Sequence, residues 1–150
     1  MRSRLAAAAC LGLLAACGNP PAAVFVRYDT GVDEPKGPDE YMNVGIALTR
    51  LRDDTALHVL VVGYADARGD NQSNRELSFR RARRVRELLL SHGVEPGRIR
   101  VAARGEDRPV ASNLTVEGQS LNRRSELFFY EPGGGDVRVQ YGAELHFDAN

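Results

Sequence analysis

Residues 57–85 read LHVLVVGYADARGDNQSNRELSFRRARRV, and this stretch decides the fold. It opens with a nearly continuous apolar run from Leu57 to Tyr64, which is typical of a central strand covered by helices. A polar turn follows and puts the carboxylate of Asp66 where the apolar run ends. A basic segment of helical periodicity then begins within residues 70–73, where Ser73-x-x-Glu76 fits a capping box. We expect it to end at His92-Gly93, since glycine can adopt the left-handed closing conformation.

Arg81 stands out in the predicted helix because it falls in the same stripe as Leu77, Val85 and Leu88. A guanidinium on the inward face needs an acceptor or an opening to solvent, because burying it unpaired is costly. One interpretation is structural: Arg81 extends to the surface or pairs with a structural carboxylate. The other is functional: Arg81 and Asp66 line one pocket that receives an oppositely charged pair.

Four motifs at family spacing resemble the OmpA-like C-terminal peptidoglycan-binding domain over about residues 57–130. They are Gly63-Tyr64-Ala65-Asp66-Ala67-Arg68-Gly69, the run Asn74-Arg75-Glu76-Leu77-Ser78-Phe79-Arg80-Arg81-Ala82, the turn Gly105-Glu106-Asp107-Arg108-Pro109, and Asn113-Leu114-Thr115 with Gly118 and Asn122-Arg123-Arg124. Each motif is weak evidence alone, whereas the four in order are specific.

The resemblance implies that the site binds the diaminopimelate of the peptidoglycan stem peptide. Asp66 would take the ammonium of diaminopimelate and Arg81 its carboxylate, which a guanidinium can hold by two oxygens. The resemblance also implies supporting roles for Asn74, Asn122 and Arg124. No metal or other cofactor is implied.

Two features depart from the family pattern. Tyr64-Ala65 stands where the family has His-Thr, and Ser73 stands where it usually has an aromatic residue. Residues 132–150 leave the pattern altogether, and their alternation predicts an extra strand or hairpin at the sheet edge, or a strand that binds a partner. Tyr64-Ala65 and this extension favour an alternative function, namely a periplasmic protein-interaction lipoprotein that keeps the fold without binding glycan.

The N-terminal segment predicts export and lipidation. Arg2 and Arg4 precede an apolar run too short to span a bilayer, and the run ends in Leu14-Ala15-Ala16-Cys17. This ending resembles the lipobox of bacterial lipoproteins, which implies removal of residues 1–16 and acylation of Cys17. Because Gly18 is not the aspartate associated with inner-membrane retention, we expect an outer-membrane anchor that faces the periplasm. The alternative is a plain secretory signal with an incidental cysteine.

The remaining segments predict strands at 24–28, 98–103 and 124–130, a helix at 40–51 and a short helix at 115–121. Residues 17–23 would be a linker, and residues 24–131 the folded domain. With the resemblance, this order predicts an α+β two-layer sandwich. Its mixed four-stranded sheet would follow the order β-α-β-α-β-β and carry the two main helices on one side.

The composition excludes several classes of function. Acidic and basic side chains balance at 20 each, so nucleic-acid binding is not expected. Both cysteines, Cys10 and Cys17, lie in the leader, which leaves no thiol for a disulfide or a metal site in the domain. The histidines show no metal spacing and no nucleophile arrangement. Only the proximity of Asp66 and Glu106 to the matching motifs supports a hydrolase that uses them as its two carboxylates. We expect no enzymatic activity.

Overall fold

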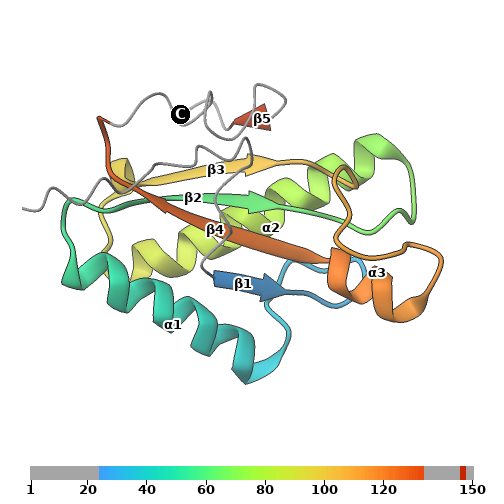
Figure 1. Ribbon diagram of the computed structural model, residues 1–150, viewed down its shortest axis with the longest axis horizontal. Coiled ribbons are helices and arrows are strands. Elements are labelled where there is room, and N and C mark those ends of the chain that lie inside the picture. Colours follow the sequence, from blue (N-terminus) through green and yellow to red (C-terminus); the bar gives the residue numbers. More distant parts are fainter. Residues whose placement is uncertain (1–23, 134–145, 148–150) are drawn as a thin grey trace, which may run out of the picture.

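The computed structural model describes residues 24–133 and 146–147. Its strands are β1 (Val24–Arg27), β2 (His58–Gly63), β3 (Ile99–Ala103), β4 (Arg124–Tyr130) and β5 (His146–Phe147). Its helices are α1 (Gly37–Asp53), α2 (Asn71–Ser91) and α3 (Val116–Asn122), with a 3₁₀ turn at Pro96–Arg98. Figure 1 shows α1 and α2 running along the sheet and α3 standing at one end of it.

The sheet has the strand order β1-β4-β2-β3-β5. β2 and β3 are parallel, whereas β4 is antiparallel to both β1 and β2, and Val61 of β2 lies opposite Val101 and Leu127. The predicted α+β fold with a mixed sheet of four main strands is therefore confirmed, and β2 is central, as its apolar run indicated. β5 adds an antiparallel pair of residues at the β3 edge. The other residues of the predicted C-terminal extension lie outside the described ones, apart from Pro132 and Gly133.

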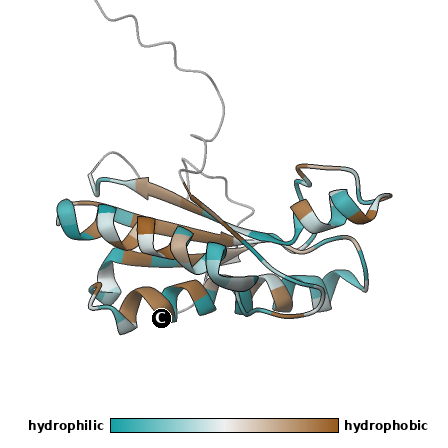
Figure 2. Ribbon diagram, turned by 90° about the horizontal axis from the view of Figure 1, so that it is seen from below, coloured by the Kyte–Doolittle hydropathy of each residue, from teal (hydrophilic) through white to brown (hydrophobic). Residues whose placement is uncertain are grey.

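Both long helices pack on the same face of the sheet (Figure 2). One apolar core joins α1 and α2 to the alternate strand residues that face them, among them Val59, Val61 and Leu127. The other strand residues, including Leu60, Val62 and Phe128, form a second buried cluster on the opposite face. No described helix is long and apolar enough to cross a membrane.

The inward face of α2 is rotated from the predicted one. Ala82, Val85 and Leu89 are buried as expected, but Leu77 and Leu88 lie at the edge and are only partly buried. Asn74, Ser78 and Arg81 take the central positions instead. Ser78 lies at the closest contact with β2, because a Cβ on Gly63 would lie only 1.8 Å from the Ser78 carbonyl oxygen. Close approach of α2 to β2 therefore outweighs burial of leucines.

α2 begins at Asn71, within the predicted range of 70–73, but its cap and the start of α1 differ from the predictions. The predicted Ser73 capping box is wrong: Asp70 is the N-cap, and its side chain accepts a hydrogen bond from the backbone N–H of Ser73 at 2.9 Å. α1 begins at Gly37, three residues earlier than predicted, because Pro38 fits the first turn of a helix. The predicted end of α2 holds, with His92 as the C-cap and Gly93 at φ 88°.

Candidate functional site

Asp66 lies just beyond the end of β2, and two arginines surround its carboxylate. Oδ2 accepts hydrogen bonds from Arg68 Nη2 at 2.6 Å and from Arg123 Nη1 at 2.9 Å. Arg68 Nε donates to the same oxygen at 3.2 Å, and the Arg68 backbone N–H donates to Oδ1 at 3.2 Å. Asp66 is only 6% exposed. It is thus a buried carboxylate whose charge is balanced by two neighbouring cations.

Arg81 is fully buried in the inward face of α2 and donates to three backbone carbonyl oxygens. Nη1 reaches Tyr64 O at 2.9 Å, Nε reaches Val32 O at 2.9 Å and Nη2 reaches Asp29 O at 3.0 Å. Its guanidinium also lies 4.9 Å from the centre of the Tyr28 ring. The structural interpretation from the sequence placed Arg81 at the surface or against a carboxylate, and neither is the case. Its hydrogen bonds go instead to backbone carbonyl groups of the β1–α1 loop and of the residue after β2.

The structure brings Arg81 and Asp66 to the same end of the sheet without a direct ion pair between them. Burial lowers the pKa of Arg81 to about 10, against the opposing influence of Tyr28 and Asp66. Arg81 therefore keeps its charge at neutral pH. Burial alone would raise the pKa of Asp66, but hydrogen bonds from Arg68 and Arg123 hold that pKa below its usual value. Both groups are charged at neutral pH.

The three supporting residues predicted from the sequence are all buried and hydrogen-bonded within the protein. Asn74 donates to Glu106 Oε2 at 2.6 Å. Asn122 accepts from the backbone N–H groups of Val110 and Ala111 and so fixes the loop before α3. Arg124 donates to Glu126 Oε1 at 2.6 Å.

Tyr64 lies beside Arg124 and shares its partner Glu126. Its ring lies 3.9 Å from the Arg124 guanidinium, and its hydroxyl donates to Glu126 Oε2 at 3.2 Å. Burial raises the pKa of the Tyr64 hydroxyl. The tyrosine belongs to the buried cluster on the face opposite the helices.

Sequence reasoning missed Arg68 and Arg123 as contacts of Asp66. Arg123 is 7% exposed and also donates to Tyr28 O at 3.1 Å, which ties the end of α3 to the end of β1. The Arg68 side chain is 47% exposed and donates to Thr30 Oγ1 at 2.9 Å. Two signals were available: Arg68 follows Asp66 by two positions, and Arg123 lies in the Asn-Arg-Arg motif.

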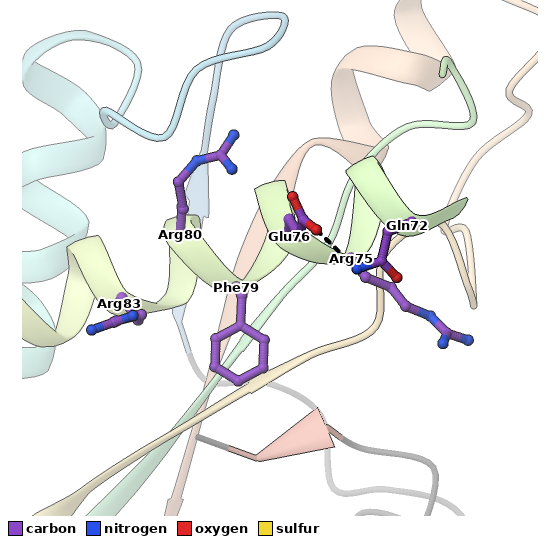
Figure 3. A pocket seen from close by; sticks show the side chains of 6 residues that line it. All are labelled: Gln72, Arg75, Glu76, Phe79, Arg80 and Arg83. Carbon is purple, nitrogen blue, oxygen red and sulfur yellow. Dashed lines mark hydrogen bonds between the residues drawn. The ribbon is translucent and has the colours of Figure 1, made fainter. Parts of the chain in front are cut away.

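Two cavities open on the surface near these elements. One, of about 680 Å³, lies between the β1–α1 region and α3, and Arg123 is among its lining residues; the others are Arg27, Lys36, Asp39, Glu40, Val116, Glu117, Ser120 and Leu121. The other, of about 450 Å³, follows the outer flank of α2 (Figure 3). There Phe79 lies among Arg75, Arg80 and Arg83. Only the first cavity touches the residues around Asp66. No described group of three or more His, Cys, Asp and Glu side chains is placed to hold a metal ion.

The family profile described as "OmpA family" matches residues 38–123. The chain belongs to the OmpA family. It is 48% identical over 115 residues to outer membrane porin F of Pseudomonas aeruginosa, covering 73% of this chain and 33% of that protein. It is 38% identical over 69 residues to the peptidoglycan-associated lipoprotein of Pseudomonas putida, covering 46% and 42%.

The fold resembles the crystal structure of the peptidoglycan-associated lipoprotein from Burkholderia pseudomallei, with a TM-score of 0.68 and 24% identity. That comparison covers 71% of this chain and 90% of the other. The chain spans about a third of the length of the porin F proteins it matches.

Proposed function

We propose that this protein binds peptidoglycan non-covalently by holding the diaminopimelate of the stem peptide at the Asp66–Arg81 end of the sheet. The observation that carries the proposal is a buried carboxylate and a buried guanidinium gathered at one end of β2: Arg81 donates to Tyr64 O, two residues before Asp66. Diaminopimelate carries an ammonium and a carboxylate on its side-chain carbon. The relative named as peptidoglycan-associated supports this ligand class.

A ligand carboxylate would replace two contacts that Arg81 makes now. Nε and Nη2 form one edge of the guanidinium, and a carboxylate can take both at once. These atoms hold Val32 O and Asp29 O, which both belong to the β1–α1 loop. Movement of that loop alone would free the edge, while Nη1 stays on Tyr64 O. Asp66 would meanwhile take the ammonium.

Asn74, Asn122 and Arg124 would support the site through the loops around it. Asn74 holds Glu106 on the turn after β3, and Asn122 holds the backbone before α3. Arg124 contacts Asn122 O at 3.4 Å and Arg108 O at 3.3 Å. These contacts would hold the turn after β3 and the loop before α3 in place near Asp66 before the ligand binds.

The proposal includes attachment to the outer membrane by lipid on Cys17, as its lipobox implies. Labelling cells with an alkyne analogue of palmitate should tag the protein, and Cys17→Ser should abolish the tag. Recovery of an unmodified Cys17, or of an intact Met1, from the membrane fraction would contradict this part.

The test of the binding proposal is co-sedimentation with purified sacculi. Asp66→Asn keeps the shape of the side chain but removes its charge, and Arg81→Lys keeps the charge but loses the two-oxygen grip. Breaking a desolvated charge pair costs about 2 to 5 kcal/mol, which is tens- to thousands-fold in affinity. Arg83→Lys, on the exposed flank of α2, is the matched control and should bind like the parent.

Two outcomes would defeat the proposal. The first is folded Asp66→Asn and Arg81→Lys proteins that bind diaminopimelate-type sacculi as the parent does. The second is equal binding of the parent to lysine-type sacculi, which lack the side-chain carboxylate.

Exposed Leu114 and Val116 near α3, at 95% and 74%, favour the second candidate, a protein-interaction lipoprotein. Failure to bind any sacculus would leave that candidate.

A further inference from the structure

The Oδ2 atom of Asp66 has no free place for a ligand cation in the structure. Oδ2 accepts three hydrogen bonds from two guanidinium groups, and Oδ1 accepts the Arg68 backbone N–H. The side chain is 8% exposed. An ammonium that pairs with Oδ2 must therefore displace one of the two arginines.

Arg123 is poorly placed to leave. Its side chain is 8% exposed, and Nε donates to Tyr28 O at 3.1 Å in a buried hydrogen bond. Moving its guanidinium would break that bond and would leave a buried cation without its carboxylate, which is strongly unfavourable. Arg123 also caps the C-terminus of α3, so its backbone is fixed.

Arg68 is the arginine that can leave at low cost. Its side chain is 47% exposed, so its guanidinium can turn into water without crossing packed side chains. Its only other partner in the described structure is the hydroxyl of Thr30, on the β1–α1 loop, at 2.9 Å. Water can replace that hydroxyl. Because the Arg68 guanidinium is half-exposed, turning it into water costs less than displacing the buried guanidinium of Arg123.

We propose that Arg68 is a displaceable competitor that sets the affinity of the Asp66 site: its guanidinium occupies the position of the ligand's ammonium and swings into solvent when the ligand binds. This inference rests on the proposed function and deepens it. The Arg68 Nη2 atom, 2.6 Å from Asp66 Oδ2, stands in for the ammonium nitrogen. The contact with Thr30 also links this exchange to the β1–α1 loop, which holds Arg81 through Val32 O and Asp29 O. Release of Arg68 therefore loosens the loop that must move to free Arg81.

The test is isothermal titration of the full-length protein in detergent with the tripeptide L-Ala-γ-D-Glu-meso-diaminopimelate. Arg68→Gln removes the competing charge and should bind about two- to fivefold more tightly, because the pair it removes has one half-exposed partner. Arg68→Lys keeps a cation beside Asp66 and should stay within about twofold of the parent. Thr30→Val leaves Arg68 in place but removes its second contact, and should tighten binding by less than Arg68→Gln does.

A second measurement follows Arg68 directly. The ¹⁵N signal of the Arg68 Nε–H should move toward its solvent-exposed position as the tripeptide is added, whereas that of Arg123 should stay. Equal or weaker binding by Arg68→Gln would overturn the competitor role, because Arg68 would then be neutral or would grip the ligand. If Asp66→Asn binds the tripeptide as the parent does, or if neither the parent nor any variant binds it, the proposed function fails and this inference fails with it. If Asp66→Asn loses binding while Arg68→Gln gains none, only this inference falls.

Discussion

At the residue scale, the unusual side chain is Arg81, a fully buried arginine whose partners are backbone carbonyls. Each of those carbonyls, on Asp29, Val32 and Tyr64, would lose its donor if the guanidinium were removed. The Tyr64 carbonyl is buried and the other two are partly buried, and leaving a buried acceptor unsatisfied costs about 1 to 3 kcal/mol. Arg81 thus fastens the β1–α1 loop to α2, whatever else it does.

Arg81→Met should therefore destabilise the fold even though it makes the core more apolar. We expect a loss of about 3 kcal/mol in the free energy of unfolding, measured by urea denaturation. Arg83→Met, two positions away on the exposed flank, should change it by less than about 0.5 kcal/mol. A loss below about 1 kcal/mol for Arg81→Met would mean that the loop finds other donors or water.

Asp66 should give a specific dependence of stability on pH. Burial acts to raise its pKa, but the hydrogen bonds from Arg68 and Arg123 leave the pKa lowered in the folded state. A carboxyl group whose pKa is lower when folded stabilises the protein above its unfolded pKa of about 3.9, and this stabilisation is lost as the pH falls through the folded pKa.

Parent and Asp66→Asn proteins should consequently differ in unfolding free energy at pH 7, and the difference should shrink as the pH falls below the unfolded pKa of about 3.9 toward the lowered folded pKa. Urea denaturation at a series of pH values measures both. A difference that stays constant from pH 7 to pH 3 would show that the hydrogen bonds matter and the charge of Asp66 does not.

Side-chain roles were only partly predictable from the sequence. The position of Arg81 in the helical stripe indicated that it faces inward, and the structure confirms this. Its carbonyl partners were not predictable, because two of them lie on a loop about 50 residues earlier in the chain. Arg123 was missed for the same reason, as its contact with Asp66 spans 57 positions. The ligand roles of Asp66, Arg81, Asn74, Asn122 and Arg124 stay predictions.

At the element scale, the contact between β2 and α2 depends on a missing side chain. A Cβ on Gly63 would lie 1.8 Å from the Ser78 carbonyl oxygen and 3.3 Å from the Ala82 backbone nitrogen. These are backbone atoms of α2, so relief requires the whole helix to shift. Gly45 in α1 has nothing within 4 Å of the same position.

Gly63→Ala should therefore destabilise the protein by about 3 kcal/mol through overpacking. Gly45→Ala should stabilise it by about 0.5 to 1 kcal/mol, because alanine is the better residue in a helix interior. Thermal unfolding of the two variants beside the parent tests both signs at once. Equal melting temperatures for Gly63→Ala and the parent would show that α2 can move away from β2 freely.

Element types were predictable because hydrophobic periodicity is local, whereas the orientation of α2 was not. The predicted inward face was centred on Leu77 and Leu88 because they are strongly apolar. In the structure Ser78 lies at the contact between α2 and β2 instead. A serine is favourable there because it is small and because its hydroxyl accepts the Gly105 N–H at 2.9 Å. That requirement arises from β3 and the turn after it, which periodicity within α2 cannot report.

At the scale of the whole molecule, the strand order β1-β4-β2-β3-β5 follows from pairings far apart in the sequence. Periodicity indicated a central β2, but the position of β4 between β1 and β2 was not predicted, because local pattern does not determine which strands pair. β5 could not be distinguished from a partner-binding strand, since alternation is the same in both cases. Its pairing with Ala102 and Ala103 covers part of the β3 edge.

The proposed anchor sets a limit on the reach of the whole molecule. Six residues separate Cys17 from Val24, which is about 20 Å when fully extended. A domain of this size adds about 35 Å, from a radius of gyration near 13 Å. The site can therefore stand no more than about 55 Å from the membrane surface, so a lipid-anchored protein reaches only a wall that lies close to the membrane.

A Gly/Ser spacer of about 12 residues after Pro21 should lift this limit, because its flexible span adds about 20 Å. In cells that make the lipidated protein, the fraction cross-linked to the sacculus by a membrane-permeant reagent should rise with the spacer. In detergent, where the anchor imposes no distance, sedimentation with sacculi should be unchanged. Asp66→Asn with the spacer should remain uncrosslinked in cells. If the spacer leaves the cross-linked fraction unchanged while the parent binds sacculi in detergent, the short linker does not restrict the protein, and the wall lies within its reach.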